Sequence, residues 1–560
     1  MDYVQAPKRG FGLYYDPLYG YVPLAPIIRR ALDLPSMQRL RHIKQLSTLF
    51  LFFPGATHSR FEHSVGVCNL AGTVFDSLFN RRVHFKMENW PEFLPVHRIA
   101  LQLGALFHDI GHGPWSHVSE LFCQMKDDYR RLRHRELTKE WIRKGVAPYN
   151  DVPAFLAKEA KRVEEEWKGM VERDKWTDIE YHTEILSPDN VANIAVGSPP
   201  TLGKDRSDFR YTFLSNIVSG VFDVDRMDYL RRDAYHAGFE TGGVDIWEII
   251  HSYTLAEEDG KWIAMLLPSA STALEILLSV RDLAYRQFYY NKMHRSAQEM
   301  MIRAMARMVE KYSVDELLVM NDEELLAALE GPRGDAFTRD VTARIRLRAV
   351  YEPLPFAIRI STDLDDSGKS AWAELAFQVP ARDLAIERWL GSEEDASGKM
   401  KLPTHQRVVF DLRPIPLVER REYETPIFYD EVKKEKKSLF DLCPHLRMIR
   451  GTRLIQFDSK EIKIDLTLQY IEEVSQLLIT LPFEYVDGIR ESCTKEMAKG
   501  KSKDAVLACH VERLKSILED LISFLRVQDE KTKTGLRQRF KESLTGYLED
   551  ICSPASPSSS

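Results

Sequence analysis

The apolar segment at residues 97–110, HRIALQLGALFHDI, is the feature that most limits how this chain can fold. Its apolar residues are dense and lie at helical spacing, so the segment predicts a buried helix. A Gly-His-Gly-Pro stretch at 111–114 follows and predicts a tight turn. The buried helix therefore ends on an adjacent histidine and aspartate, His108 and Asp109.

Asp109 needs a compensating charge at that place. A carboxylate on an apolar stretch costs several kcal/mol unless it is paired or bound to a metal ion. His63 and Asp225 are further nitrogen and oxygen donors, in segments that begin or end on helices. Two imidazoles and two carboxylates suit a divalent ion with open water positions, namely Mn²⁺, Fe²⁺, Mg²⁺ or Zn²⁺. The sequence predicts a metal site formed by His63, His108, Asp109 and Asp225.

Helical spacing of apolar residues recurs along the first part of the chain, which predicts a mainly α fold. Residues 26–50 show it with a break at 33–35, and residues 266–312 contain no glycine, which predicts one or two long helices there. The charged stretch 124–180 predicts solvated helices that could deliver one residue to the site. Beyond residue 350, short β-branched runs bounded by Gly, Pro and Asp predict a smaller mixed α/β lobe.

The length of 560 residues exceeds what one hydrophobic core usually supports, so we expect several units. Amphipathic helices are expected again at 503–528 and 534–551. The predicted organisation is a helical catalytic core at 1–330, linker helices and a mixed lobe at 331–450, a strand and helix region at 451–552, and a solvated Pro/Ser-rich tail at 553–560.

Composition excludes some classes of function. The net charge of −7 argues against a surface that attracts polyanions everywhere and leaves nucleic-acid binding only to a local basic groove. The six cysteines form no C-x-x-C pair, so a disulfide framework or a zinc knuckle is not indicated. No signal-peptide pattern and no apolar stretch of membrane-spanning length occur, so we expect a soluble, cytoplasmic protein with soluble partners.

Three blocks give the chain a specific resemblance. HSRFEHSVGV at 58–67, ALFHDIGHGPWSH at 105–117 and DVDRMDYLRRDAYHAG at 223–238, in this order, resemble the deoxynucleoside triphosphate triphosphohydrolases of the HD superfamily. The similarity runs from near Tyr15 to about residue 300. It implies an HD-domain helical core, assigns the four predicted ligands to the family's metal positions, and implies hydrolysis of deoxynucleoside triphosphates to deoxynucleoside and inorganic triphosphate.

The resemblance also implies a proton-transfer group. His117 takes a position that faces the α-phosphate, where an imidazole can deliver a proton to the leaving 5′-oxygen. Glu120 follows by one helical turn and can orient it. His112 would stand beside the metal, or would only satisfy backbone carbonyls in its Gly/Pro loop. A further family histidine corresponds to His134, with His182 as the competing choice.

Substrate-binding positions are implied in the same way. Four of them recur at steps of four, four and three, which puts them on one face of a predicted helix; the alternative is an ordinary solvent-facing helix. The family uses such positions for the phosphates, the 3′-hydroxyl and the deoxyribose ring. The predicted substrate-binding residues are Gln45, Arg60, Tyr229, Asp233, Arg281, Tyr285, Tyr289 and Lys292.

Regulation and assembly are implied by the family as well. Relatives form tetramers or hexamers, and some bind activating nucleotides between subunits; Asp33 and residues 38–45 match part of that region. We therefore expect a homo-oligomer and a nucleotide effector, in a process such as nucleotide-pool control or defence against phage. The alternatives are another HD phosphohydrolase, such as a phosphodiesterase or nuclease, and a nucleotide sensor without turnover. The H-x-x-x-[DE]-G-x-G-Y-P wording of cyclic-dinucleotide phosphodiesterases is absent.

Overall fold

The computed structural model describes residues 13–124, 134–172, 175–203, 205–239, 244–309, 311–353 and 425–443, with short stretches elsewhere between 358 and 543. Over these residues the chain is mainly α-helical with a small mixed α/β part, which confirms the predicted fold class. The tail at 553–560 and nearly all of the helices expected at 503–528 and 534–551 lie outside the described residues. The division into four regions remains a prediction.

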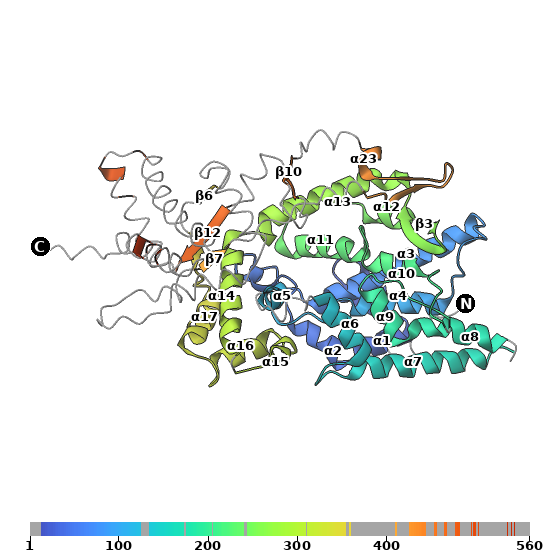
Figure 1. Cartoon of the computed structure of the whole chain (residues 1–560), viewed down its shortest axis with the longest axis horizontal. Helices are drawn as coiled ribbons and strands as arrows, with labels where there is room; N and C mark the ends of the chain where they lie inside the picture. The colour runs from blue at the N-terminus through green and yellow to red at the C-terminus, as the bar shows by residue number, and fades with distance from the viewer. Residues whose placement is uncertain are drawn as a thin grey trace, which may run out of the picture.

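Two buried helices form the centre of the helical body, α3 (Arg60–His84) and α4 (Pro95–Phe107). They pack against each other, and α9 (Pro188–Ala195), α10 (Thr212–Val218) and α11 (Val224–Ala237) surround them (Figure 1). Proline occupies the first turn of α4, where its missing N–H costs nothing. The helix predicted from the apolar run is confirmed, and His108 is its C-cap.

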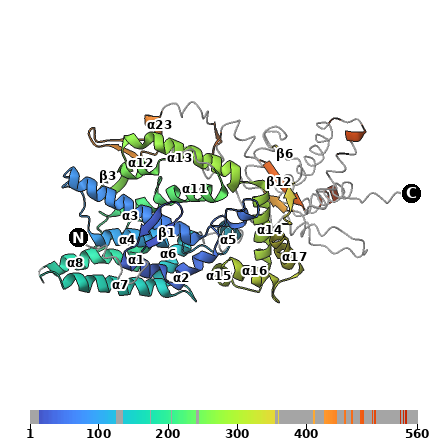
Figure 2. The ribbon, with the colours of Figure 1, turned by 180° about the vertical axis from the view of Figure 1, so that it is seen from behind.

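The segment before α3 contains short helices separated by the predicted break. They are α1 (Pro26–Leu32) and α2 (Pro35–Arg39), each with proline in its first turn, followed by the 3-10 turns η1 (Leu40–His42) and η2 (Ser47–Leu51). Ahead of them, β1 (Leu13–Asp16) and β2 (Gly20–Pro23) form an antiparallel hairpin, which is seen from behind in Figure 2.

The charged stretch folds into helices along one edge of the body, as expected. The helix α5 (His117–Gln124) leads into it, and α6 (His134–Lys144), α7 (Asp151–Lys168) and α8 (Trp176–Thr183) follow. Only one face of α6 is buried, through Leu137, Trp141 and Ile142 among others, and this face fixes the position of the helix start.

The long helical segment forms two helices, within the prediction of one or two, but a π-helical turn that the sequence did not predict lies between them. The helix α13 (Ser271–Ala284) continues as a π-helical turn, η7 (Tyr285–Tyr289), and α14 (Lys292–Met308) begins a new helix. Asn291 causes the restart, because its side chain accepts the amides of Met293 and His294. The prediction of one regular face from Arg281 to Lys292 is therefore wrong, since π-helical geometry and a new N-cap intervene.

Three helices follow: α15 (Val314–Leu318), α16 (Asp322–Glu330) and α17 (Ala336–Arg346), of which α16 and α17 pack against α14. Each begins with a polar N-cap in a capping box, Ser313, Asn321 and Asp335 respectively.

Besides the β1–β2 hairpin, the body contains a four-stranded sheet of order β3-β4-β8-β9. The helix α12 (Ile246–His251) precedes the antiparallel pair β3 (Tyr253–Glu258) and β4 (Lys261–Leu266). The strands β8 (Phe428–Asp430) and β9 (Glu435–Lys437) extend this pair, with Leu266 opposite Phe428, and α23 (Leu439–Leu442) follows.

A second sheet lies beside α14 and has β12 (Gln476–Leu481) at its centre. Its neighbours are β5 (Glu352–Pro353), β6 (Ile358–Arg359) and β7 (Val409–Asp411), and β10 (Arg453–Ile455) pairs separately with β11 (Ile464–Leu466).

Candidate active site

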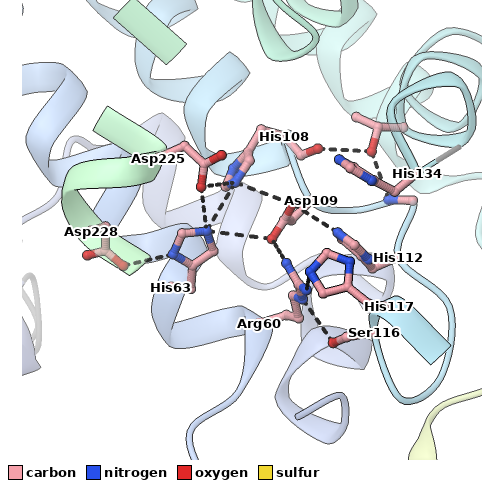
Figure 3. Close-up of polar contacts among 12 residues, drawn as sticks. Arg60, His63, His108, Asp109, His112, Ser116, His117, His134, Asp225 and Asp228 are labelled. Atoms are coloured by element: carbon pink, nitrogen blue, oxygen red, sulfur yellow. Dashed lines mark hydrogen bonds and ion pairs between the residues drawn. The ribbon is translucent and has the colours of Figure 1, made fainter. Parts of the chain in front are cut away.

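Four side chains from three helices converge on one point, and we call them the metal-ligand set: His63, His108, Asp109 and Asp225 (Figure 3). His63 lies in the first turn of α3, His108 and Asp109 follow α4, and Asp225 lies in the first turn of α11. The Nε2 atoms of the two histidines are 3.2 Å apart, and Oδ1 of Asp225 is 3.1 Å from Nε2 of His63. Oδ1 of Asp109 is 3.4 Å from Nε2 of His108.

The other nitrogen of each ring already has a partner. Nδ1 of His63 donates to Oδ2 of Asp228 at 2.8 Å, and Nδ1 of His108 donates to the Ala105 carbonyl at 2.7 Å. Each Nε2 therefore presents its lone pair to the same space, together with two carboxylates. Such a group of donors is stable only around a positive charge, so the residues fit a divalent cation. His63, His108 and Asp109 have donor atoms close enough to hold a single metal ion.

The pKa values of the set point the same way. Burial lowers the pKa of His63, but hydrogen bonds to Asp225 and Asp228 outweigh it and raise the pKa to about 10. Burial favours the neutral form of Asp109, yet the charges of Arg60 and His108 hold its pKa well below the usual value. The environment thus keeps the carboxylates ionised and favours positive charge between them.

A buried ion-pair network supports His63 from behind. Arg232, fully buried, donates from Nε and Nη2 to both oxygens of Asp228, and its Nη2 lies 2.9 Å from Oδ2 of Asp16 on β1. The network needs room beside α3, and Gly66 provides it: a Cβ there would lie 2.0 Å from Oδ1 of Asp228 and 2.4 Å from Nη2 of Arg232. The position and tautomer of His63 are therefore fixed by residues that do not face the metal-ligand set.

A second group, the proton-transfer cluster, lies next to the metal-ligand set and consists of His117, Glu120 and His134. Glu120 links the two rings, since its carboxylate oxygens lie 3.1 Å from Nδ1 of His117 and 3.2 Å from Nδ1 of His134. Burial favours the neutral form of Glu120, but the bonds to His117 and His134 lower its pKa far below the usual value. An ionised Glu120 orients both rings.

His112 connects the two groups. Its Nε2 lies 3.3 Å from Oδ1 of Asp109, and its ring stacks on His134 with centroids 4.4 Å apart. Burial and the charge of Arg60 lower its pKa well below the usual value, so the ring is neutral. Asp109, His112 and His134 also have donor atoms close enough to hold an ion. His182, the competing choice for His134, instead packs against His97 at a 3.1 Å ring-nitrogen distance, away from this group.

Arg60 connects the metal-ligand set to the turn that leads to His117. Its Nη1 donates to Oδ2 of Asp109 at 2.6 Å, its Nε donates to Oγ of Ser116 at 3.0 Å, and its Nη2 lies 3.4 Å from Nε2 of His117. The guanidinium is 4% exposed, so its charge acts inside the site. The loop that carries His108 and Asp109 is tied to α6 by Thr138, which donates to the His108 carbonyl and accepts the Gly111 amide.

The predicted sugar-binding residues form a third group along α11. Asp225, Tyr229 and Asp233 recur every four residues and so share one face of the helix. Tyr289 donates to one oxygen of Asp233, and Nε2 of His58 lies 2.8 Å from the other. Burial raises the pKa of Tyr289 well above its usual value, which keeps the phenol protonated.

The remaining predicted substrate-binding residues are placed differently from one another. The guanidinium of Arg281 lies 5.4 Å from the ring centroid of Tyr285, and the Tyr285 ring lies 5.0 Å from that of Tyr289. Gln45 is buried beside His58, and its backbone N–H donates to the His58 carbonyl at 3.0 Å. Lys292 is exposed at the start of α14, beyond the η7 turn. The functional roles assigned to these positions remain predictions.

Some supporting residues were missed in the sequence. Asp228 and Arg232 lie in the same DVDRMDYLRRD block as Asp225 and repeat at a step of four, a pattern that could have suggested a second, inward face of the helix. His58 lies within the HSRFEH block. Asp16 had no signal, because its partner Arg232 is more than 200 residues away.

Comparisons with known proteins agree with this arrangement. Residues 60–196 match the family model of the HD domain. The deoxynucleoside triphosphate triphosphohydrolase SAMHD1 of Danio rerio is 28% identical over 296 residues, covering 52% of this chain and 44% of the relative. The mouse (Mus musculus) protein of the same name is 32% identical over 232 residues, covering 41% and 32%. The uncharacterized protein YwfO of Bacillus subtilis is 27% identical over 296 residues, covering 53% and 55%.

The chain thus spans about half, or less, of the length of these relatives. The matched family model contains His63, His108 and Asp109, whereas Asp225 lies beyond its end. Separately, none of the described helices has the length and apolar character needed to cross a bilayer.

Proposed function

We propose that this chain, an HD-superfamily protein similar to deoxynucleoside triphosphate triphosphohydrolases, hydrolyses deoxynucleoside triphosphates to deoxynucleoside and inorganic triphosphate. The observation that carries the proposal is the face of α11, which leads from Asp225 in the metal-ligand set to Asp233 beside Tyr289. These two carboxylates are two helical turns apart, roughly 12 Å along the axis. One face can therefore serve both a phosphate held at the metal and a sugar hydroxyl further along.

The metal-ligand set supports the phosphate end of this assignment. A divalent ion held by His63, His108, Asp109 and Asp225 would polarise a phosphoryl oxygen as a Lewis acid. Arg60, paired with Asp109, orients that ligand and adds a buried positive charge that favours an anionic substrate.

The proton-transfer cluster supports cleavage at the α-phosphate. Water oxygen forms a bond to the α-phosphorus while the bond from phosphorus to the 5′-oxygen breaks. His117 gives its proton to the departing 5′-oxygen, and Glu120 stabilises the imidazolium before transfer through its bond to Nδ1. The attacking water releases one proton to solvent, and His117 takes up one proton from solvent after the transfer, so the site returns to its starting protonation state. The products are a deoxynucleoside and intact triphosphate.

The sugar end rests on the group formed by Asp233, Tyr289 and His58. The Asp233 carboxylate can accept a hydrogen bond from a 3′-hydroxyl, and the partly buried Tyr289 ring beside it restricts the space for the sugar. A crowded sugar site would favour deoxyribose over ribose, because a 2′-hydroxyl needs both volume and a partner.

The phosphorus products test this proposal. Metal-loaded protein is incubated with each of the four deoxynucleoside triphosphates, and the products are resolved by ³¹P NMR. Inorganic triphosphate as the first product supports it, whereas pyrophosphate or orthophosphate would indicate another HD phosphohydrolase. Absence of turnover with every metal and added nucleotide would indicate a sensor. His182→Ala, outside the site, serves as a control that should retain turnover.

Nucleotide control, assembly as a tetramer or hexamer and a cytoplasmic location belong to the same proposal. Part of the predicted effector segment already has a structural role, since Arg39 is buried and donates to the carbonyls of Leu318, Val319 and Met320. Arg41 is exposed and donates to Oε1 of Gln38 at 2.8 Å, so it is the better candidate to meet an effector phosphate. A rate that is unchanged by any added nucleotide, measured on the assembled protein, would argue against effector control.

A further inference from the structure

The turn that delivers His117 has an unfavourable backbone conformation. Trp115 and Ser116, the two residues before His117, both have left-handed backbone angles, with φ of 58° and 53°. Neither is glycine, and each residue of this kind costs on the order of 1 kcal/mol or more. Two in succession persist only where the surrounding structure holds them.

Direct hydrogen bonds hold this turn. The Trp115 amide donates to Oδ1 of Asp322 at 2.6 Å, and Oγ of Ser116 donates to the Lys44 carbonyl at 2.6 Å. Oγ of Ser116 also accepts the Nε of Arg60 at 3.0 Å. The Trp115 side chain is buried, and its ring stacks on Phe50.

Asp322 links this turn to a second loop. It is the first residue of α16, and its other oxygen, Oδ2, accepts the Lys44 amide at 2.9 Å. One carboxylate therefore bonds both the His117 turn and the Lys44 loop, which are also joined through Ser116. The start of α16 is itself fixed by the bonds of Arg39 to the three carbonyls that end α15.

The burial of Asp322 makes this arrangement costly. The residue is 2% exposed, and burial raises its pKa to about 6 despite the two amides and the charges of Lys44 and Arg39. Packing of α16 does not need the carboxylate, because Leu325, Leu326 and Leu329 bury the helix face. A buried carboxylate that accepts backbone amides from two loops is better explained by a role in holding those loops, one of which leads to His117.

We propose that Asp322 is a positioning residue for the reaction: through the Trp115 amide it holds the strained turn that brings His117 to Glu120 and Arg60. The inference rests on the proposed function only for the role of His117. The bracing of the turn itself depends on the geometry of Asp322, Trp115 and Lys44. Nothing in the sequence around residue 322 suggests it, because the two loops lie more than 200 residues away.

The test compares Asp322→Ala and Asp322→Asn in the full chain with Asp335→Ala. Asp335 is a matched control, since its carboxylate also accepts a backbone amide at a helix start, that of Thr338 at 2.8 Å, but contacts neither loop. The first measurement is hydrogen–deuterium exchange of the peptide that contains Trp115, with metal content alongside. The second is kcat and KM for the deoxynucleoside triphosphate that is turned over.

Asp322→Ala should speed exchange around Trp115 and lower kcat by ~10–100-fold, the cost of misplacing a catalytic group, with KM and metal content little changed. Asp322→Asn keeps one acceptor oxygen and should fall between Asp322→Ala and the unchanged chain. Asp335→Ala should leave exchange around Trp115 and kcat unaltered.

Exchange around Trp115 that does not change in Asp322→Ala overturns the inference, whatever the turnover. Equal losses in Asp322→Ala and Asp335→Ala also overturn it, because they would show general destabilisation. If the unchanged chain turns over no deoxynucleoside triphosphate, the proposed function fails alone, and the exchange comparison still decides whether Asp322 braces the turn.

Discussion

The metal-ligand set and the proton-transfer cluster lie side by side, but they are built in opposite ways. The side chains of His63 and His108 are 1% and 7% exposed, and the ring nitrogen of each that faces away from the set has a fixed partner. The side chain of His117 is 57% exposed and is held by Glu120 and a strained turn. The two histidines of the metal-ligand set are thus enclosed, whereas His117 is open to the solvent; Asp225, at 30%, and Glu120, at 15%, lie between them.

The difference fits the roles proposed for the two groups. Metal ligands must keep one geometry, so buried partners that fix their tautomers are an advantage. A proton donor must meet a leaving group that comes with the substrate, so it has to remain accessible. Substitutions should therefore separate metal binding from turnover, and the following predictions run from the largest expected effect to the smallest.

Asp109→Asn should disrupt the metal-ligand set. The variant keeps the shape of the side chain but removes the charge that faces the ligands and Arg60. We expect metal affinity to fall by more than the ~10–100-fold that is typical when an outer partner is lost, and turnover to become undetectable. Metal content after gel filtration measures the loss of metal, and the rate of product formation measures the loss of turnover. Full metal content in this variant would contradict the assignment of the ligand.

His117→Gln should disrupt only the proton-transfer cluster. Loss of the proton donor should lower kcat by ~10²–10⁴-fold, while metal content stays at the level of the unchanged chain. The same two assays apply. Loss of metal together with activity would mean that the groups are not separable, and the contrast drawn above would fail.

Asp228→Asn should weaken metal binding by the metal-ligand set, although Asp228 is not a member of it. The variant removes the carboxylate that receives the Nδ1 proton of His63 and pairs with Arg232. We expect metal affinity to fall by ~10–100-fold, with kcat largely restored at saturating metal. Titration of the metal by calorimetry measures the change. An unaltered affinity would show that burial alone fixes His63.

Tyr289→Phe lies outside both groups and should have the smallest effect. It removes one hydrogen bond to Asp233, a net loss of about 1 kcal/mol, while His58 keeps its contact. We expect KM to rise about fivefold, with unchanged metal content and little change in kcat. A large loss of kcat would instead tie this residue to the chemical step.

The sequence predicted the parts of the site that depend on local patterns. The buried helix that ends at His108 follows from apolar spacing, and the helical excursion through His134 follows from its charged composition. The turn after Asp109 follows from its Gly/Pro content. The one-turn pairing of His117 with Glu120 is confirmed as a contact. Each of these needs only residues that are close together in the chain.

Features that depend on distant residues could not be predicted. The restart of the helix at Lys292 is different, because it was missed although it is local: Asn291 caps α14 after the π-helical turn, and asparagine is a preferred N-cap residue. The network of Asp16, Arg232 and Asp228 joins the hairpin β1–β2 to α11, and Asp322 joins α16 to two loops. These contacts exist only once the helices have packed.

Gly66 shows what this dependence on packing means for experiments. It has no side chain to bind an ion, yet an added methyl group would occupy the space of Asp228 and Arg232 and so displace His63. A mutational scan scored by activity alone would rank Gly66 with the metal ligands. The missing methyl group is therefore as much a part of the coordination chemistry of this protein as the imidazole one turn earlier on the same helix.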